Sequence, residues 1–209
     1  MMFKKILALA PHPDDCEFSC GGTIKKLTLA GAEVHYITFS PCTKSVPKGY
    51  SKDVLFNELF SAAEKLGVSK SNITTFDFPV RELDKHRQEI LEELVKIRNS
   101  FQPELVLLPD SSDVHQDHQV IHNEGKRAFK HTCMIGYELP WNSFSFKNTF
   151  YSKLEKQHLD AKIAAIGTFQ SQQFRNYSSA DFFYGLARVR GVQINCEFAE
   201  AFEVIRWVI

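Results

Sequence analysis

Two short clusters of histidine and aspartate carry most of the chemistry that this sequence offers. They are residues 12–15 (HPDD) and residues 115–118 (HQDH), and each follows a short apolar segment of strand length. In open parallel sheets, ligands bind outside the carboxyl ends of the strands. The first and fourth strands of such sheets are commonly neighbours. We therefore expect both clusters to converge on one site.

Two imidazoles and a carboxylate in such a site predict a zinc ion. His12, Asp15 and His118 would supply three protein ligands and leave a fourth position for water, as in catalytic zinc sites. Zinc lowers the pKa of a bound water to about 7, provided that a base accepts its proton. Asp14 stands beside a ligand without having to be one, and we assign it as that base. Cys16 remains open as an additional ligand because thiolates also bind zinc.

The second cluster also offers an electrostatic catalyst. His115 can stabilise a developing oxyanion or protonate a leaving amine, and Asp117 can hold the His115 imidazole in the required tautomer. A purely structural reading takes Pro13 as a turn residue and the aspartates as helix caps. That reading does not explain two His/Asp clusters at equivalent strand ends.

The elements that must position these residues alternate between strand and helix. We predict strands over residues 6–10, 34–39, 73–78, 105–108, 134–137 and 201–207, and helices over residues 17–30, 54–66, 85–100, 117–130, 154–167 and 180–189. This alternation is typical of an α/β fold with a mostly parallel sheet and helices on both faces. No linker, repeat or low-complexity stretch interrupts the chain, so residues 1–209 are expected to form a single domain.

Composition and charge restrict the classes of molecule that the protein is expected to bind. Lys plus Arg and Asp plus Glu are equal at 25 each, so there is no net charge to attract nucleic acid. No apolar stretch reaches the ~18 residues of a transmembrane segment. The odd number of cysteines, 5, indicates reduced thiols, and we predict a cytoplasmic protein. A small, neutral or locally recognised molecule is the expected substrate.

Several motifs resemble the PIG-L/LmbE-like N-acetylglucosaminyl deacetylases, a family that includes deacetylases of mycothiol and bacillithiol biosynthesis. The resemblance covers nearly the whole chain, and its motifs are specific. They are residues 10–15 (APHPDD), 20–23 (CGGT), 58–67 (ELFSAAEKLG), 115–118 (HQDH), 171–172 (SQ), 190–191 (RG) and 200–202 (EAF).

The resemblance implies a Rossmann-like fold and removal of an acyl group, acetyl above all, from an amino sugar. It implies zinc on His12, Asp15 and His118, with Asp14 as general base and His115 as electrostatic catalyst. The small-molecule substrate would be a free amino sugar or a nucleotide-linked, lipid-linked or thiol conjugate. A homo-oligomer is compatible with the sequence.

Two departures from the family pattern are visible. Cys16 separates the two aspartates from Glu17, and Leu55 and Phe56 occupy positions before Glu58 where relatives often carry an arginine. The second departure puts substrate contacts in doubt. Two other functions stay open: a catalytically silent sugar-binding protein of the same fold, and a metallophosphoesterase. The first would have no need of Asp14, and the second often requires two metals and more carboxylates.

Overall fold

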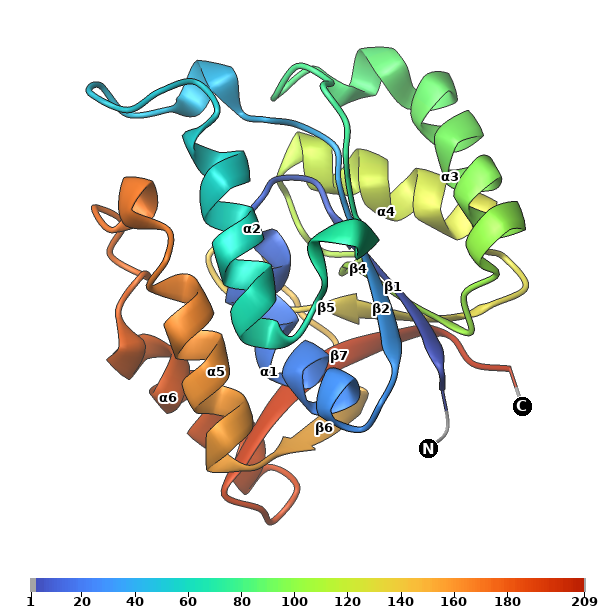
Figure 1. Cartoon of the computed structure of the whole chain (residues 1–209). Helices are drawn as coiled ribbons and strands as arrows, with labels where there is room; N and C mark the ends of the chain where they lie inside the picture. Colours follow the sequence, from blue (N-terminus) through green and yellow to red (C-terminus); the bar gives the residue numbers. More distant parts are fainter. Residues whose placement is uncertain (1–2, 209) are drawn as a thin grey trace.

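A seven-stranded sheet forms the centre of the protein in a computed structural model that describes residues 3–208 (Figure 1). The strand order is β3-β2-β1-β4-β5-β7-β6. The strands are β1 (Lys5–Ala10), β2 (Glu33–Thr38), β3 (Ile73–Thr75), β4 (Leu105–Pro109), β5 (Cys133–Tyr137), β6 (Phe150–Leu154) and β7 (Phe198–Arg206). The strands β1 to β5 run parallel to one another, which confirms the mostly parallel sheet. The expected pairing of the first and fourth strands is also present.

The far edge of the sheet differs from the prediction. Strand β7 runs antiparallel to β5, and β6 runs antiparallel to β7. Strand β6 was not predicted, and a helix was expected from Leu154 onward, whereas the helix begins at Lys156. The alternation in β6 is weak because Ser152 occupies one of its two buried positions, so the segment lacks the apolar pattern of a strand.

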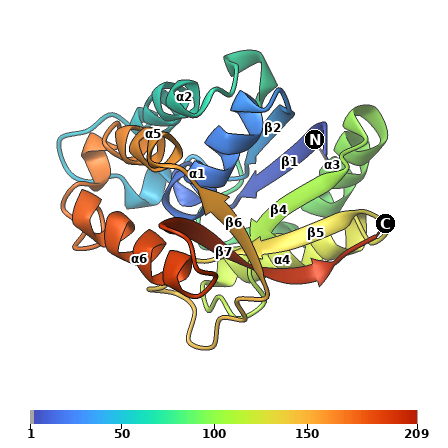
Figure 2. The ribbon, with the colours of Figure 1, turned by 90° about the horizontal axis from the view of Figure 1, so that it is seen from below.

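Helices cover both faces of the sheet, as predicted (Figure 2). They are α1 (Asp15–Leu29), α2 (Val54–Leu66), α3 (Arg87–Phe101), α4 (Gln116–Ala128), α5 (Lys156–Ile166) and α6 (Ala180–Val192). Helices α1, α2, α5 and α6 lie on one face, and α3 and α4 lie on the other. Strand β1 divides its side chains between two apolar cores, with Ile6 and Ala8 in one and Leu7 and Leu9 in the other. This alternation follows from the period of two along a strand.

Helix α1, which begins inside the first His/Asp cluster, is interrupted at Cys20 (φ −122°, ψ 19°). The Glu200 carboxylate of β7 caps the second half of the helix. It accepts hydrogen bonds from the backbone N–H groups of Gly22 (3.0 Å) and Thr23 (2.7 Å). These donors would otherwise be unpaired at the new helix start.

A buried lysine completes this junction. The Nζ atom of Lys162 in α5 donates to the backbone oxygen of Ser19 (2.8 Å) and pairs with Glu200 Oε1 (2.7 Å). The side chains of Lys162 and Glu200 are only 3% and 6% exposed. Helix α1 is thereby bound to α5 and β7 one turn after the first cluster. Among residues 3–208, no helix has both the length and the apolar character needed to cross a membrane.

Candidate metal centre

The two His/Asp clusters meet at the carboxyl ends of β1 and β4. His12 Nδ1 lies 3.2 Å from His118 Nε2, and Asp15 Oδ2 lies 3.4 Å and 3.3 Å from the same two nitrogens. In a tetrahedral zinc site with ligands at 2.0–2.1 Å, neighbouring ligand atoms stand about 3.3 Å apart. The triangle of two imidazoles and one carboxylate therefore fits a zinc ion in both donor chemistry and spacing.

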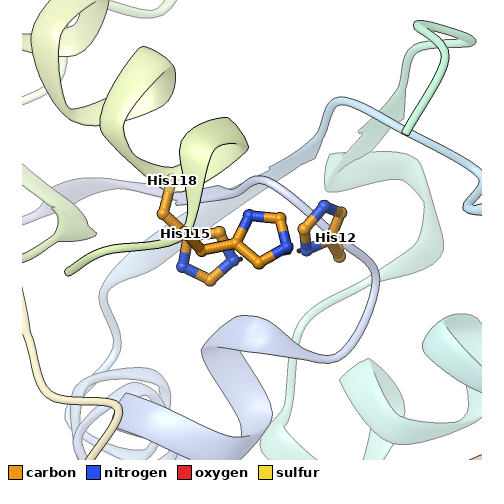
Figure 3. A group of neighbouring side chains, drawn as sticks. All are labelled: His12, His115 and His118. Atoms are coloured by element: carbon orange, nitrogen blue, oxygen red, sulfur yellow. Dashed lines mark hydrogen bonds between the residues drawn. The ribbon is translucent and has the colours of Figure 1, made fainter. Parts of the chain in front are cut away.

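Local structure explains how the three side chains converge. His12 lies in the loop after β1, and Asp15 is the first residue of α1. The Asp15 carboxylate also accepts a hydrogen bond from the backbone N–H of His12 (2.8 Å), which fixes the loop. His118 lies in the first turn of α4, so the pairing of β1 with β4 brings it to the same edge. His12 and His118 face one another, with the His115 ring beside them (Figure 3).

Carboxylates orient both imidazoles. Asp117 Oδ2 lies 2.9 Å from His12 Nε2, and Asp113 Oδ2 lies 2.7 Å from His118 Nδ1. Each ring therefore presents its other nitrogen to the triangle, an arrangement common around metal-binding histidines. The Asp117 carboxylate contacts His12 and not His115. Asp117 instead reaches His115 through its backbone N–H, which donates to His115 Nδ1 (3.2 Å).

The role of Asp113 was not predicted. The spacing Asp113-x-His115-x-Asp117 could have indicated it, because the loop folds back so that Asp113 also accepts from the backbone N–H of His115 (2.8 Å). Cys16 is buried in the apolar core and forms no side of the triangle.

His115 is a fourth group close to the triangle. Its ligand atom and those of His12 and His118 all lie within 4.8 Å of one another, which gives a second conceivable metal-binding set. We favour Asp15 as the third ligand because its oxygen lies within 3.4 Å of both other donors. Burial and the neighbouring His118 and His12 lower the pKa of His115 to about 4, so its ring is neutral at pH 7.

The electrostatics of the centre favour a cation. Burial alone would lower the pKa of the His12 and His118 imidazoles. Asp15 and Asp117 outweigh burial at His12 and raise its pKa to about 9. Asp15 and Asp113 do the same at His118 and raise its pKa to about 10. The same negative potential that holds protons on these rings would stabilise a divalent metal ion.

Asp14 has a different environment from Asp15. Burial and the neighbouring Asp15 raise the pKa of Asp14 to about 6, against the opposing effects of His12 and Arg175. The pKa of Asp15 is shifted well below its usual range, because the attraction of His118 and His12 outweighs burial. The two adjacent carboxylates therefore have clearly different pKa values, as expected for a base beside a metal ligand.

A cleft with two lobes opens over the centre. Both lobes are lined by His12, Asp14, His115 and Arg175. The larger lobe, of about 230 Å³, contains the triangle and is completed by Asp15, Phe18, His118, Trp141, Asn142 and Tyr177. The smaller lobe, of about 100 Å³, is completed by Cys42, Ser45, Leu55, Val80, Arg81 and Gln172.

One wall of the larger lobe is aromatic. Trp141 and Tyr177 are stacked, with ring centroids 3.8 Å apart and planes 5° apart, and Phe18 meets Trp141 edge to face. Sequence reasoning gave no role to Tyr177 or Arg175. Both residues lie in a stretch without regular helix or strand, where no periodicity indicates which side chains point inward.

Comparison with known sequences identifies similar proteins. The profile of a family described as PIG-L, GlcNAc-PI de-N-acetylase, matches residues 7–129, a range that includes both His/Asp clusters. Diacetylchitobiose deacetylase of Thermococcus kodakarensis is 36% identical over 127 residues, which are 56% of this chain and 45% of that protein. An uncharacterized deacetylase of Escherichia coli, YaiS, is 24% identical over 80% of this chain and 91% of its own length. The match thus spans less than half of the Thermococcus protein.

Solved structures share the fold. N,N'-diacetylchitobiose deacetylase from Pyrococcus horikoshii, solved with an inhibitor, superposes with a TM-score of 0.81 over 97% of this chain and 84% of that chain, at 24% identity. The 4-carboxy-2-hydroxymuconate hydratase GalB from Pseudomonas putida reaches a TM-score of 0.80 at 21% identity, covering 99% of this chain and 98% of that one. Different reactions therefore occur on this fold.

Proposed function

The chain belongs to the PIG-L family of GlcNAc-PI de-N-acetylases, and we propose on that basis that it is a zinc-dependent hydrolase of N-acylated amino sugars. The expected acyl group is acetyl, and the expected substrate is an amino sugar or an amino-sugar conjugate. The observation that carries the proposal is the triangle of His12, Asp15 and His118 with Asp14 beside it in an open cleft. The deacetylases among the similar sequences support the same reaction class.

The three ligand side chains would hold the metal. Zinc bound there would act as a Lewis acid on the amide carbonyl and would make water a stronger nucleophile. Asp113 and Asp117 would keep the two imidazoles in the tautomers that present Nε2 of His118 and Nδ1 of His12.

Asp14 would move the proton. Its carboxylate lines both lobes of the cleft and is positioned to accept a proton from the attacking water. Its raised pKa, about 6, is close to the range in which a carboxylate both accepts a proton and gives it up. The same carboxyl group would then deliver that proton to the leaving sugar nitrogen.

His115 would stabilise the developing negative charge. Its Nδ1 atom accepts a hydrogen bond from the Asp117 backbone, so the proton of the neutral ring lies on Nε2. An Nε2–H group on a neutral imidazole is a hydrogen-bond donor that needs no reorganisation during the reaction.

The fold by itself does not select this reaction, because a hydratase shares it. The family match and the Asp14 geometry carry the assignment. The test is acetate release by the purified protein from N-acetylglucosamine, its chitobiose and its simple glycosides, with and without a chelator, together with zinc content. Chelator-sensitive acetate release supports the proposal. A protein that binds sugar without releasing acetate would instead support a silent binding protein, and failure to bind zinc at all would overturn the metal assignment.

A further inference from the structure

The smaller lobe of the cleft contains two arginines without acidic partners. Arg81 and Arg175 both line it, and within the described residues neither has a carboxylate at ion-pair distance. Four other arginines do pair with glutamates: Arg87, Arg127, Arg188 and Arg190. Two arginines that line one small cavity create a local positive potential in a chain of zero net charge.

Arg175 is held in place by a chain of hydrogen bonds that begins in α2. The carboxylate of Glu58 accepts from the backbone N–H (2.9 Å) and hydroxyl (2.6 Å) of Ser171. The Ser171 hydroxyl in turn accepts from Gln172 Nε2 (3.1 Å). Gln172 Oε1 accepts from Arg175 Nε (2.7 Å), and Arg175 Nη1 donates to the Tyr177 hydroxyl (2.8 Å). These contacts leave further N–H groups of the guanidinium available to a ligand.

Arg81 is fixed through its backbone. It has a left-handed conformation (φ 67°), and its N–H donates to Asp117 Oδ2 (2.7 Å), the carboxylate that orients His12. A non-glycine residue in this region costs free energy and is kept where its surroundings impose it. The neighbouring carboxylate, Glu82, already pairs with Lys44 and Lys85 (2.8 Å) and is not available to Arg81.

The lobe adjoins the reaction centre. It shares His12, Asp14 and His115 with the lobe that holds the triangle. In a 2-acetamido sugar, C1, where conjugates are joined, is one of the two ring carbons next to the carbon that bears the amide. Because the smaller lobe borders the triangle, it is a space that a substituent on C1 can enter while the amide lies over the triangle.

We propose that Arg81 and Arg175 form a subsite for an oxyanionic substituent, a phosphate or a carboxylate, on the amino-sugar substrate. This inference rests on the proposed deacetylase function and narrows its substrate class. Arginine suits this role because its planar fork donates two hydrogen bonds to one phosphate or carboxylate group. Asp14 is the acidic group that lines the same lobe, and it lies on the side shared with the reaction centre.

The kinetic test compares three substrates that differ at C1: the methyl glycoside, the carboxymethyl glycoside and the 1-phosphate of N-acetylglucosamine. The zinc-loaded protein should release acetate from at least one anionic substrate with a kcat/KM about tenfold or more above that for the methyl glycoside. Preference for both anions indicates a general oxyanion subsite, and preference for the phosphate alone assigns it to phosphate; both support the inference. A ratio near one for both anions overturns it.

Substitutions assign the effect to the arginines. Arg81→Met and Arg175→Met should each lower the anionic preference about fivefold to tenfold, mainly through a higher KM, and Arg175→Lys should restore only part of it. The control is Arg206→Met, at the exposed carboxyl-terminal end of strand β7 and not among the residues that line the cleft, which should keep the wild-type preference. An unchanged preference in both Arg81 and Arg175 variants would overturn the assignment.

A binding measurement separates this inference from the reaction itself. Calorimetric titration of the zinc-loaded protein with N-acetylglucosamine 1-phosphate should show tighter binding than with the methyl glycoside, and the difference should shrink in Arg81→Met and Arg175→Met. If no substrate releases acetate, the proposed function fails, and this titration still decides the subsite. Equal affinity for the two ligands would then exclude it.

Discussion

The carboxylate of Asp117 lies 2.9 Å from Nε2 of His12, on the side of the ring opposite the metal triangle. In the neutral form that a metal ligand must have, an imidazole has one donor and one acceptor nitrogen, so this contact places the proton on Nε2 and the lone pair on Nδ1. Asp113 does the same for His118 with the nitrogens exchanged. The two rings thus approach the triangle through different atoms, and each depends on its own carboxylate.

Asp113→Asn should weaken zinc binding about tenfold to a hundredfold while leaving all three ligands in place, because the His118 ring loses a charged partner that fixes its tautomer. Competition with a fluorescent chelator measures the affinity. The matched control is Asp84→Asn at an exposed position, which should not change it. Equal affinities in Asp113→Asn and wild type would show that the carboxylate does not support the metal.

Asp14→Asn should retain zinc and lose about a hundredfold or more in kcat, because the amide cannot accept the proton of the attacking water. His118→Ala should lose both zinc and turnover. Zinc content by atomic absorption and acetate release are measured on the same samples, and circular dichroism checks that His118→Ala is folded. Equal loss of zinc in the two variants would contradict the division between base and ligand.

Removal of zinc should lower the thermal stability of the protein. A ligand at a hundredfold excess over its Kd stabilises the native state by about 2.7 kcal/mol, which is roughly 5–10 °C in Tm for a domain of this size. Differential scanning calorimetry with and without a chelator measures the shift. The shift should persist in Asp14→Asn and vanish in His118→Ala; a shift of equal size in His118→Ala would place the metal elsewhere.

Lys162→Met should lower the free energy of unfolding by about 3 kcal/mol, because it leaves the Glu200 carboxylate buried without its cation. Urea unfolding measures the change. The control on the same helix is Lys156→Met, which removes the exposed pair with Asp160 and should leave stability unchanged within error. Equal effects of the two variants would argue against a structural role for the buried pair.

Gly136→Ala should destabilise the protein and weaken zinc binding together. A Cβ atom at Gly136 would stand 2.8 Å from the backbone Cα of Asp110, where the loop that carries Asp113 and His115 begins. The control is Gly185→Ala in α6, where a Cβ atom meets nothing within 4 Å and the gain in helix propensity should stabilise by about 0.5–1 kcal/mol. Thermal unfolding and zinc titration test both variants.

Sequence reasoning recovered the parallel half of the fold because its signals are local. Apolar runs such as residues 6–10 and 105–108 are buried on both faces and bounded by turn residues, so their lengths identify strands. Strand β6 carries no such run, and the antiparallel return of β7 depends on long-range pairing. The pairing of β1 with β4, on which the site depends, followed from a general rule of doubly wound sheets.

The convergence of the two His/Asp clusters could be predicted for a related reason. His12, Asp15 and His118 were visible because residue type and position at strand ends are local features. The partner of the Asp117 carboxylate could not be predicted, because His12 and His115 both lie within reach and only the three-dimensional arrangement selects one. Arg175 and Tyr177 reach the cleft from irregular backbone, and their orientation depends on the hydrogen bonds through Gln172.

The contacts that brace α1 form late in translation, because Lys162 and Glu200 lie in the last quarter of the chain. The proposed ligands His12, Asp15 and His118 leave the ribosome before Lys162 and Glu200, which brace α1, and before β5, which covers the edge of β4. A nascent chain of the first 130 residues or so ends before β5 and would expose the edge of β4, a known hazard for aggregation. The stretch matched by the family profile, residues 7–129, therefore includes the proposed metal ligands but none of the strands β5, β6 and β7.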